Sequence, residues 1–309
     1  MSETVIRVDS LVKKYGNFTA VNGISFEIRR GEILAFLGPN GAGKTTTVET
    51  LECLKTPTSG LVNILGYDVR KDERKIKGRI GVLPQSFSTY DWLTVRENLL
   101  YFGKMYPQHA DVDKLIELFG LKEKRDSLFR SLSGGLKQRV GIAISLINDP
   151  EIVFLDEPTT GLDPKARRDV WAAIKELKSH GKTVLLTTHY MDEAYALADR
   201  ICVIHKGKII AEGTPEDLIN QYGGGNTLII RECTPQALER LSQNLPGSRI
   251  SGNDLQVSLP EGNGTGAISR AVAAIGGDQL SCKEIYVKKA SLEDVFLNLT
   301  GEVLTEGAQ

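Results

Sequence analysis

The feature that most restricts what this chain can fold into is a glycine-rich stretch that ends in a lysine and a threonine. Residues 38–45 read Gly-Pro-Asn-Gly-Ala-Gly-Lys-Thr and match the pattern GxxxxGK[ST]. The apolar run Ile33–Leu37 precedes the stretch, and residues 45–54 have helical character. A strand, a loop and a helix in this order predict a phosphate-binding loop, whereas a glycine-rich stretch alone would indicate only a turn.

The chemistry of this loop follows from its residue types. Glycines let successive backbone N–H groups point at phosphate oxygens, and the N-terminus of the following helix favours an anion. The lysine adds a positive charge, and the first threonine can ligate Mg²⁺ through its hydroxyl. We expect the phosphates of a nucleotide to be held by Gly38, Pro39, Asn40, Gly41, Ala42, Gly43, Lys44, Thr45 and Thr46.

Two carboxylates follow a second apolar run. Residues 152–155 are all apolar, and Asp156 and Glu157 come directly after them. Ligands of open α/β sheets bind at the carboxyl ends of the strands. Asp156 is suited to hold Mg²⁺ through water, and Glu157 to polarise an attacking water as general base. An Asp-Glu pair alone is more often a helix cap or a solvated loop, but the phosphate-binding loop favours the catalytic interpretation.

Three other features are ambiguous when each is taken by itself. Ser133, Gly134 and Gly135 stand directly before a helical segment, where they form either an anion site or a simple N-cap. His189 follows the apolar run 183–186 and can contact a terminal phosphate, although a lone histidine at a strand end is usually structural. Gln85, taken alone, does not indicate a function.

The periodicity predicts an α/β fold. Short apolar runs at 33–37, 152–155, 183–186 and 201–204 alternate with helical segments such as 165–178. Strands that are buried on both faces have this pattern, so we expect a mostly parallel core sheet that is wrapped by helices. Alternating apolar and polar residues near the start of the chain predict a β-rich edge.

Two further regions differ from this core. Helical spacing dominates between residues 85 and 140 and predicts a helical subdomain over about 86–140. A glycine run at 222–226 marks a candidate boundary, so we expect a nucleotide-binding domain over 1–221 and an accessory domain over 222–309. The accessory domain has a βαββαβ order of predicted elements, which fits a small ferredoxin-like α+β domain.

Composition excludes several classes of protein. A chain with 41% hydrophobic and 25% charged residues is typical of a globular protein. With a net charge of −1, the chain as a whole does not attract nucleic acid or anionic lipid, and only a local basic patch could do so. The best apolar run, 140–147, is too short to span a bilayer, and residues 1–10 do not resemble a signal peptide. The four cysteines are scattered, and we expect reduced thiols at Cys53, Cys202, Cys233 and Cys282.

Taken together, the motifs resemble those of ABC-type ATP-binding domains over about residues 4–219. The order and approximate spacing match for Lys44 in its loop, Gln85, Leu132-Ser133-Gly134-Gly135, Asp156-Glu157, Gly161-Leu162-Asp163 and His189. The Ser-Gly-Gly signature distinguishes this class from P-loop kinases and GTPases. Tyr15 stands where such domains usually place an aromatic side chain that stacks on adenine.

The resemblance implies ATP hydrolysis by a head-to-tail dimer. Ser133 and Gly135 of one subunit would close on the γ-phosphate that Lys44 of the other subunit holds, and Asp163 would link the two sites. The partner would be a second copy or a homologous ATPase subunit. ATP binding would close this dimer and hydrolysis would reopen it, because only ATP carries the γ-phosphate that both subunits contact.

The resemblance also implies individual roles. Glu157, His189 and Lys44 would be catalytic, with His189 sensing the γ-phosphate. Magnesium would be held by Thr45, Gln85 and Asp156. The loop around Gln85 would couple the nucleotide to a transmembrane permease subunit, which would place the chain at the cytoplasmic face of the cell membrane.

One residue departs from the family pattern. The signature usually continues with Gln, whereas Leu136 stands here and Gln138 follows two places later. A leucine side chain cannot hydrogen-bond the nucleotide, but the backbone and Ser133 contacts remain, so we expect activity to persist.

The end of the chain points to export. Residues 290–301 resemble the ending of ATPases that serve prokaryotic drug, polysaccharide, haem or sodium exporters, and an importer ATPase is the alternative. Leu292, Val295, Phe296 and Leu299 form one apolar helix face, which we expect to pack on the chain or on a dimer mate. A soluble ABC ATPase that acts on ribosomes or DNA would generally carry two cassettes or a long coiled-coil insertion; neither occurs, so we expect no nucleic-acid partner.

Overall fold

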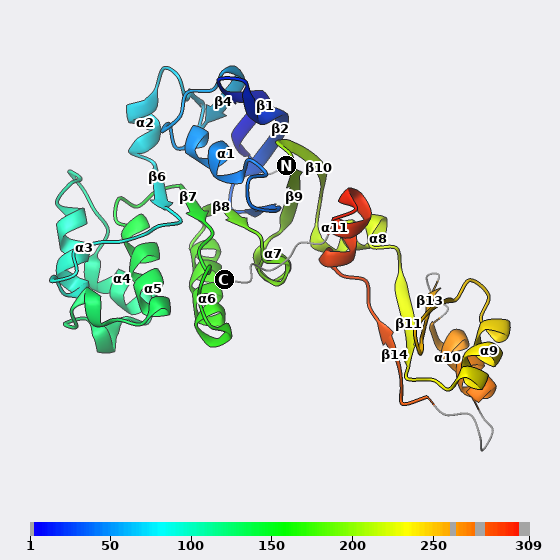
Figure 1. Ribbon diagram of the computed structural model, residues 1–309. Coiled ribbons are helices and arrows are strands. Elements are labelled where there is room, and N and C mark those ends of the chain that lie inside the picture. Colours follow the sequence, from blue (N-terminus) through cyan, green and yellow to red (C-terminus); the bar gives the residue numbers. More distant parts are fainter. Residues whose placement is uncertain (1–2, 260–263, 276–281, 303–309) are drawn as a thin grey trace. The chain divides into compact units, whose positions relative to one another are not determined.

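The computed structural model describes residues 3–259, 264–275 and 282–302, which form two compact units (Figure 1). The chain passes from the first unit to the second between Pro215 and Glu216. The boundary that the glycine run predicts lies a few residues later, after residue 221, and the assignment of roles to the two domains stays a prediction.

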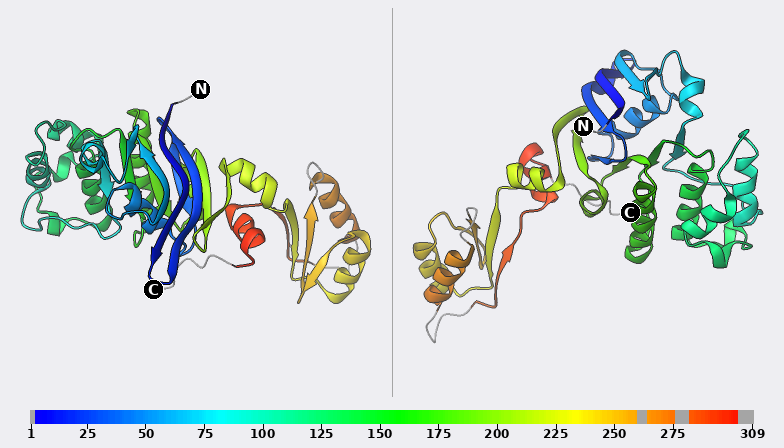
Figure 2. Two further views of the ribbon diagram at one scale, coloured as in Figure 1. Left: turned by 90° about the horizontal axis from the view of Figure 1, so that it is seen from above. Right: turned by 180° about the vertical axis from the view of Figure 1, so that it is seen from behind.

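A six-stranded sheet forms the centre of the first unit (Figure 2). Its strands are, from one edge to the other, β10 (Lys208–Gly213), β9 (Arg200–His205), β3 (Ile33–Leu37), β8 (Thr183–Thr188), β7 (Ile152–Asp156) and β6 (Ile80–Leu83). β10 runs antiparallel to β9, and the other neighbours pair in parallel. Every residue of β3, β7 and β8 is buried, which explains their continuous apolar sequences. The prediction of a mostly parallel core sheet is confirmed.

Helices follow three of the parallel strands. α1 (Lys44–Leu51) comes after β3, α6 (Pro164–Ser179) after β7, and α7 (Met191–Leu197) after β8. The strands run in the same direction, so the segments after β3, β6, β7 and β8 meet at one edge of the sheet. This edge carries the candidate site.

A four-stranded antiparallel sheet packs against the core sheet and forms the predicted β-rich edge. Its strands are β2 (Phe18–Arg29), β1 (Thr4–Tyr15), β4 (Ser59–Ile64) and β5 (Tyr67–Asp68), in that order. Alternate residues of β2 point into the core, where the Phe26 ring meets the Phe36 ring edge to face at 5.0 Å. The short helix α2 (Glu73–Lys77) leads from this sheet to β6, a strand that the sequence reading missed.

Helices occupy much of residues 95–145, and the assignment of a helical subdomain to about 86–140 stays a prediction. They are α3 (Val95–Gly103), α4 (Val112–Leu118) and α5 (Gly134–Ser145), with 3₁₀ turns at Lys122–Lys124 and Phe129–Ser131. A capping box starts α3: the Thr94 hydroxyl accepts from the Glu97 backbone N–H, and the Glu97 carboxylate accepts from the Thr94 N–H. None of the helices in the described ranges has the length and apolar character needed to cross a membrane.

The second unit is a small α+β domain with helices at both ends of its sequence. Its elements are α8 (Pro215–Tyr222), β11 (Asn226–Arg231), α9 (Pro235–Asn244), β12 (Arg249–Ser251), β13 (Asp254–Leu259), α10 (Gly264–Ile275), β14 (Glu284–Lys288) and α11 (Leu292–Thr300). The sheet order is β12-β13-β11-β14, with antiparallel neighbours. Leu241 of α9 packs with Leu228 of β11 and Leu255 of β13. This topology supports the ferredoxin-like interpretation, which stays a prediction.

The apolar face of α11 is buried within the chain. Leu292, Val295 and Phe296 are each at most 3% exposed. In addition, Asn298 Nδ2 donates a 2.8 Å hydrogen bond to the Tyr222 carbonyl at the end of α8. Three of the four residues predicted for this face therefore pack on the chain itself, and Leu299 is half-buried.

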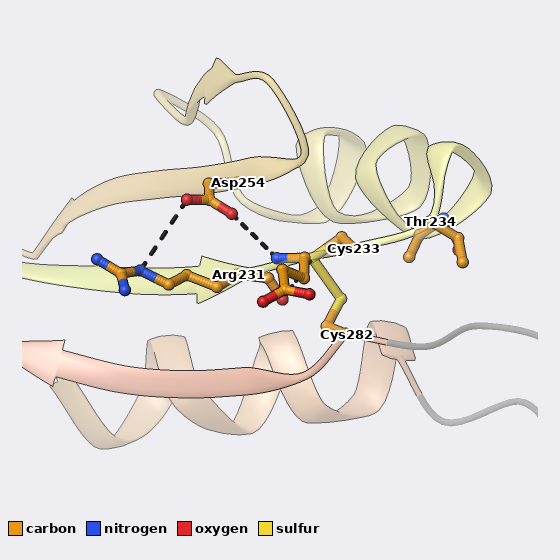
Figure 3. Close-up of a disulfide and its surroundings, with 7 residues drawn as sticks. Arg231, Cys233, Thr234, Asp254 and Cys282 are labelled. Atoms are coloured by element: carbon orange, nitrogen blue, oxygen red, sulfur yellow. Dashed lines mark hydrogen bonds and ion pairs between the residues drawn. A yellow bond between two sulfur atoms is a disulfide. The ribbon is translucent and has the colours of Figure 1, made fainter.

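Two of the four cysteines form a disulfide, so the expectation of reduced thiols is wrong for Cys233 and Cys282. Figure 3 shows the bond where β11 ends and β14 begins. The antiparallel register pairs Arg231 with Glu284, and the two cysteines lie two residues beyond that pair, with their Cα atoms 4.0 Å apart. Their separation of 49 residues concealed the pairing. Cys53 and Cys202 are free.

Reducing this disulfide should destabilise the second unit. Closing a loop of this length stabilises a fold by about 4 kcal/mol through the entropy of the unfolded chain, which for a small unit corresponds to a fall in Tm of ~20 °C. The measurement is calorimetry of the whole chain with and without dithiothreitol. The double variant Cys233→Ser/Cys282→Ser should reproduce the shift, and Cys53→Ser should not. A thermogram that reductant leaves unchanged would contradict the prediction.

Candidate functional site

The phosphate-binding loop, residues 38–43, connects β3 to α1 and is shaped by close backbone contacts. A Cβ atom at Gly38 would stand 2.1 Å from the Ile204 carbonyl oxygen. Gly43 has a φ of 103°, and a Cβ atom there would stand 2.5 Å from the Ala20 carbonyl oxygen. Only glycine fits at these two positions. The loop thus holds the N-terminus of α1 in place, where backbone N–H groups can bind an anion.

Lys44 points into the site and not into solvent. Its side chain is 4% exposed, and Nζ donates to the Gly38 carbonyl at 2.7 Å and to the Pro39 carbonyl at 3.1 Å. Nζ also lies 3.5 Å from Glu157 Oε1. Burial lowers the pKa of Lys44, while the carboxylates of Glu157 and Asp156 oppose that shift. The Lys44 amine is therefore buried between the phosphate-binding loop and two acidic side chains.

Asp156 and Thr45 bring hard oxygen atoms together beside this lysine. Thr45 Oγ1 donates to Asp156 Oδ1 at 3.4 Å, and the Thr187 hydroxyl of β8 donates to the same Oδ1. Burial raises the pKa of Asp156, and these two hydroxyls counteract the effect. Thr46 also lies in the first turn of α1, where its carbonyl accepts from the Thr50 hydroxyl.

Glu157 is the residue on which the other side chains converge. Its Oε2 accepts from Gln85 Nε2 at 3.0 Å and from Thr160 Oγ1 at 3.1 Å, and His189 Nδ1 lies 3.3 Å away. Burial favours the neutral acid, but His189, Lys44 and Thr160 outweigh it and lower the pKa of Glu157 to about 2. The carboxylate is therefore ionised throughout the physiological range.

The backbone at Glu157 is strained as well as anchored. Its φ is 48°, in the left-handed region that disfavours a residue with a side chain. The Glu157 N–H donates to both the carbonyl and the hydroxyl of Thr187, each at 3.1 Å. These contacts turn the chain out of β7 and direct the carboxylate toward Lys44 and His189.

The second candidate anion site lies apart from this cluster. Ser133 is an exposed N-cap of α5, and its hydroxyl makes no capping hydrogen bond. A Cβ atom at Gly135 would stand 2.8 Å from Ala166 Cβ, and one at Gly134 would stand 3.1 Å from Leu162 Cδ2. These residues thus abut the segment around Leu162. Across the described ranges, no hydrogen bond or ion pair joins them to Lys44 or Glu157.

Two other expected site residues also lie outside the cluster. Asp163 is the N-cap of α6, where its Oδ1 accepts from the backbone N–H groups of Lys165 and Ala166, each at 3.0 Å. These hydrogen bonds, with that of Ala166 first, lower its pKa. Tyr15 is 43% exposed at the end of β1, with Lys13 Nζ 5.1 Å from the centre of its ring. An exposed ring at this point is free to stack on a base.

Two residues of the cluster were missed by the sequence reading. Thr187 contacts Asp156 and the Glu157 backbone, and Thr160 contacts the Glu157 carboxylate. The position of Thr187 at the carboxyl end of β8 was an available signal, because residues at that edge face the site. Thr160 carried no such signal, since it stands in a loop between Glu157 and Asp163.

Comparison with known proteins gives one consistent result. A family model described as ABC transporter matches residues 21–160. The chain is 37% identical to the daunorubicin resistance ATP-binding protein DrrA3 of Streptomyces coeruleorubidus, over 98% of both chains. It is 39% identical to the Nod factor export ATP-binding protein I of Paraburkholderia xenovorans, over 99% of this chain and 100% of the relative. The linearmycin resistance ATP-binding protein LnrL of Bacillus subtilis is 34% identical over 98% of this chain and 100% of its own length.

Solved structures agree with these relatives. An ATP-binding cassette of an ABC transporter, in its ADP conformation, superposes with a TM-score of 0.65 at 27% identity, over 72% of this chain and 95% of that one. A cassette in a dimeric post-hydrolysis state, bound to ADP and phosphate, gives a TM-score of 0.60 at 28% identity, over 68% of this chain and 98% of that one.

Proposed function

We infer that this chain, which belongs to the ABC transporter family of ATP-binding proteins, is the ATP-hydrolysing subunit of an exporter. The observation that carries the inference is the convergence of Gln85, His189 and Lys44 on Glu157, beside the phosphate-binding loop. Relatives named for daunorubicin resistance, Nod factor export and linearmycin resistance match nearly the whole chain, second unit included. These names favour export over import.

Binding of ATP is assigned to one edge of the core sheet. The loop residues Gly38, Pro39, Asn40, Gly41, Ala42 and Gly43 surround the phosphates together with Thr46 of α1. Lys44 Nζ exchanges its contact with Glu157 for the β- and γ-phosphates, and Tyr15 stacks on adenine. Because Lys44 is one of the groups that lower the pKa of Glu157, this exchange raises the basicity of that carboxylate.

The residues beside Lys44 fit a magnesium ion. Thr45 Oγ1 and Asp156 Oδ1 lie 3.4 Å apart, and Gln85 adds an amide. A hydroxyl and a single carboxylate are the donors with which proteins usually complement the phosphates around Mg²⁺. The ion would neutralise charge that develops on the phosphates during transfer.

Hydrolysis uses Glu157 as the general base. Its Oε2 is oriented by Gln85 and Thr160, and it is ionised, so it can accept the proton of an attacking water. His189 stands beside the same oxygen and contacts the γ-phosphate. In-line attack then yields ADP and phosphate, and catalysis consists of positioning and of charge stabilisation by Lys44.

The complete site requires a second subunit. Ser133 and Gly135 lie at the N-terminus of α5, with the Ser133 hydroxyl exposed, and they offer N–H and O–H donors to the γ-phosphate held by another copy. Gly134 belongs to the same donor set, and Asp163 connects the two sites. The dimeric cassette bound to ADP and phosphate supports this arrangement. A homologous ATPase subunit is the alternative partner.

The same subunit must contact a permease, and exposed aromatic side chains near Gln85 are suited to that contact. Tyr90 is 47% and Trp92 69% exposed, and the Arg130 guanidinium lies 3.5 Å from the centre of the Trp92 ring. Tyr101 and Met105 of the α3 region are exposed too. These exposed side chains come shortly after Gln85 in the chain. A permease bound to them at the cytoplasmic face would therefore be connected to the catalytic site through the Gln85 segment.

Size-exclusion chromatography with light scattering tests the dimer. Purified Glu157→Gln should be a monomer alone and with Mg-ADP, and a dimer with Mg-ATP. Adding Ser133→Arg to this variant should prevent the dimer, because the arginine side chain fills the space for the γ-phosphate. An oligomeric state that is the same with ATP, with ADP and without nucleotide would overturn the sandwich mechanism.

A further inference from the structure

Glu193 is a buried carboxylate that the proposed reaction leaves without a role. It lies in α7, four residues after His189, and its exposed fraction is 0%. Its Oε1 accepts two hydrogen bonds, from Thr159 Oγ1 at 2.7 Å and from Trp171 Nε1 at 3.0 Å. A buried carboxylate is costly for folding even when it is hydrogen-bonded, so a structural role alone is a poor account of it.

Glu193 cross-links two short segments that both contain proposed catalytic residues. The segments are 157–160 and 189–193. At one end His189 Nδ1 lies 3.3 Å from Glu157 Oε2, and at the other the Thr159 hydroxyl donates to Glu193. Thr159 and Glu157 are only two residues apart. The hydrogen bond between Thr159 and Glu193 therefore restricts the distance between Glu157 and His189.

Helix α6 holds the second of these segments from the other side. Trp171 donates to Glu193, and Arg167 Nη1 donates to Asp192 Oδ2 at 3.2 Å. The Arg167 guanidinium also lies 4.0 Å from the centre of the Tyr190 ring. Helix α6 therefore fixes the segment 189–193. The hydrogen bond from Thr159 to Glu193 then positions Glu157 relative to this segment.

We propose that Glu193 is a positioning residue for ATP hydrolysis, which acts through Thr159 to hold Glu157 and His189 at contact distance. Glu193 reaches the phosphate-binding loop only indirectly, through Thr188, whose carbonyl accepts from the Gly38 N–H at 3.3 Å. Its loss should therefore lower kcat more than it raises the KM for ATP. The proposal rests on the proposed function, because that function assigns Glu157 and His189 to the reaction.

Matched substitutions at both ends of the hydrogen bond test the proposal. Thr159→Val removes the donor and keeps the shape, and it should lower the kcat of the full-length chain about tenfold, the effect expected when one buried hydrogen bond is lost. Thr159→Ser keeps the hydroxyl and should stay within about threefold of wild type. Glu193→Leu also removes the acceptor of the Trp171 hydrogen bond, so it should lower kcat at least as much as Thr159→Val. Glu193→Gln, whose amide oxygen can accept both hydrogen bonds, should match Thr159→Ser.

Combination with His189→Ala separates positioning from general destabilisation. If Glu193 and Thr159 act through the His189 contact, Thr159→Val should have no further effect on the residual single-turnover rate of His189→Ala. An equal loss in both backgrounds would overturn the proposal, and so would wild-type kcat in Thr159→Val. Unchanged turnover in His189→Ala itself would instead refute the catalytic role of His189 in the proposed function.

Discussion

Glu157→Gln lowers the kcat of ATP hydrolysis about a thousandfold, while the affinity for ATP stays within about threefold of wild type. The amide has the shape of the carboxylate and can still accept hydrogen bonds from Gln85 and Thr160 through its oxygen. It cannot accept a proton from water, so the chemical step loses its base. The measurement is steady-state phosphate release, with ATP affinity from a fluorescent nucleotide.

Glu151→Gln is the matched control for this substitution. Glu151 stands at the opposite end of the same strand, where it pairs with Arg30 at 2.8 Å and Arg79 at 2.6 Å on the surface. Its kcat should equal that of wild type, because these partly exposed ion pairs lie at the other end of the strand from the reacting groups and contribute little to stability. If Glu157→Gln hydrolysed ATP at the wild-type rate, another group would have to be the base.

Lys44→Met weakens the binding of ATP about a hundredfold, as expected when a hydrogen bond from a charged group to phosphate is lost from a buried site. Lys44 is 4% exposed and is held by two loop carbonyls beside Glu157, so its charge stands at the phosphate-binding loop itself. Titration calorimetry with ATP measures the loss, and circular dichroism checks the fold.

Lys77→Met serves as the control for lost charge alone. Lys77 pairs with Glu73 at 2.6 Å on the surface of α2, where solvent screens the pair. Its substitution should leave ATP affinity unchanged. Equal affinities of Lys44→Met and wild type would mean that the phosphate-binding loop holds no phosphate.

Local sequence patterns were enough to predict most of the first unit. The apolar runs of β3, β7, β8 and β9 are continuous because these strands are buried on both faces, and each was found within two residues of its ends. β6 was missed because four apolar residues before a helical region do not distinguish a strand from a turn. In the second unit, the order of predicted elements agrees with the strands and helices of the structure.

Neighbouring residues indicate which groups can bind phosphate and act on it, because glycine spacing, a lysine and paired carboxylates after a strand are local properties of the sequence. Which side chains contact one another depends on the folded chain. Parallel pairing of β7 with β8 brings Thr187 to Asp156, and the antiparallel register of β11 with β14 joins Cys233 to Cys282. The docking of α7 on α6 places Glu193 against Thr159. Such contacts depend on the register of strands and the packing of helices that are far apart in the chain, so local sequence patterns do not specify which residues pair.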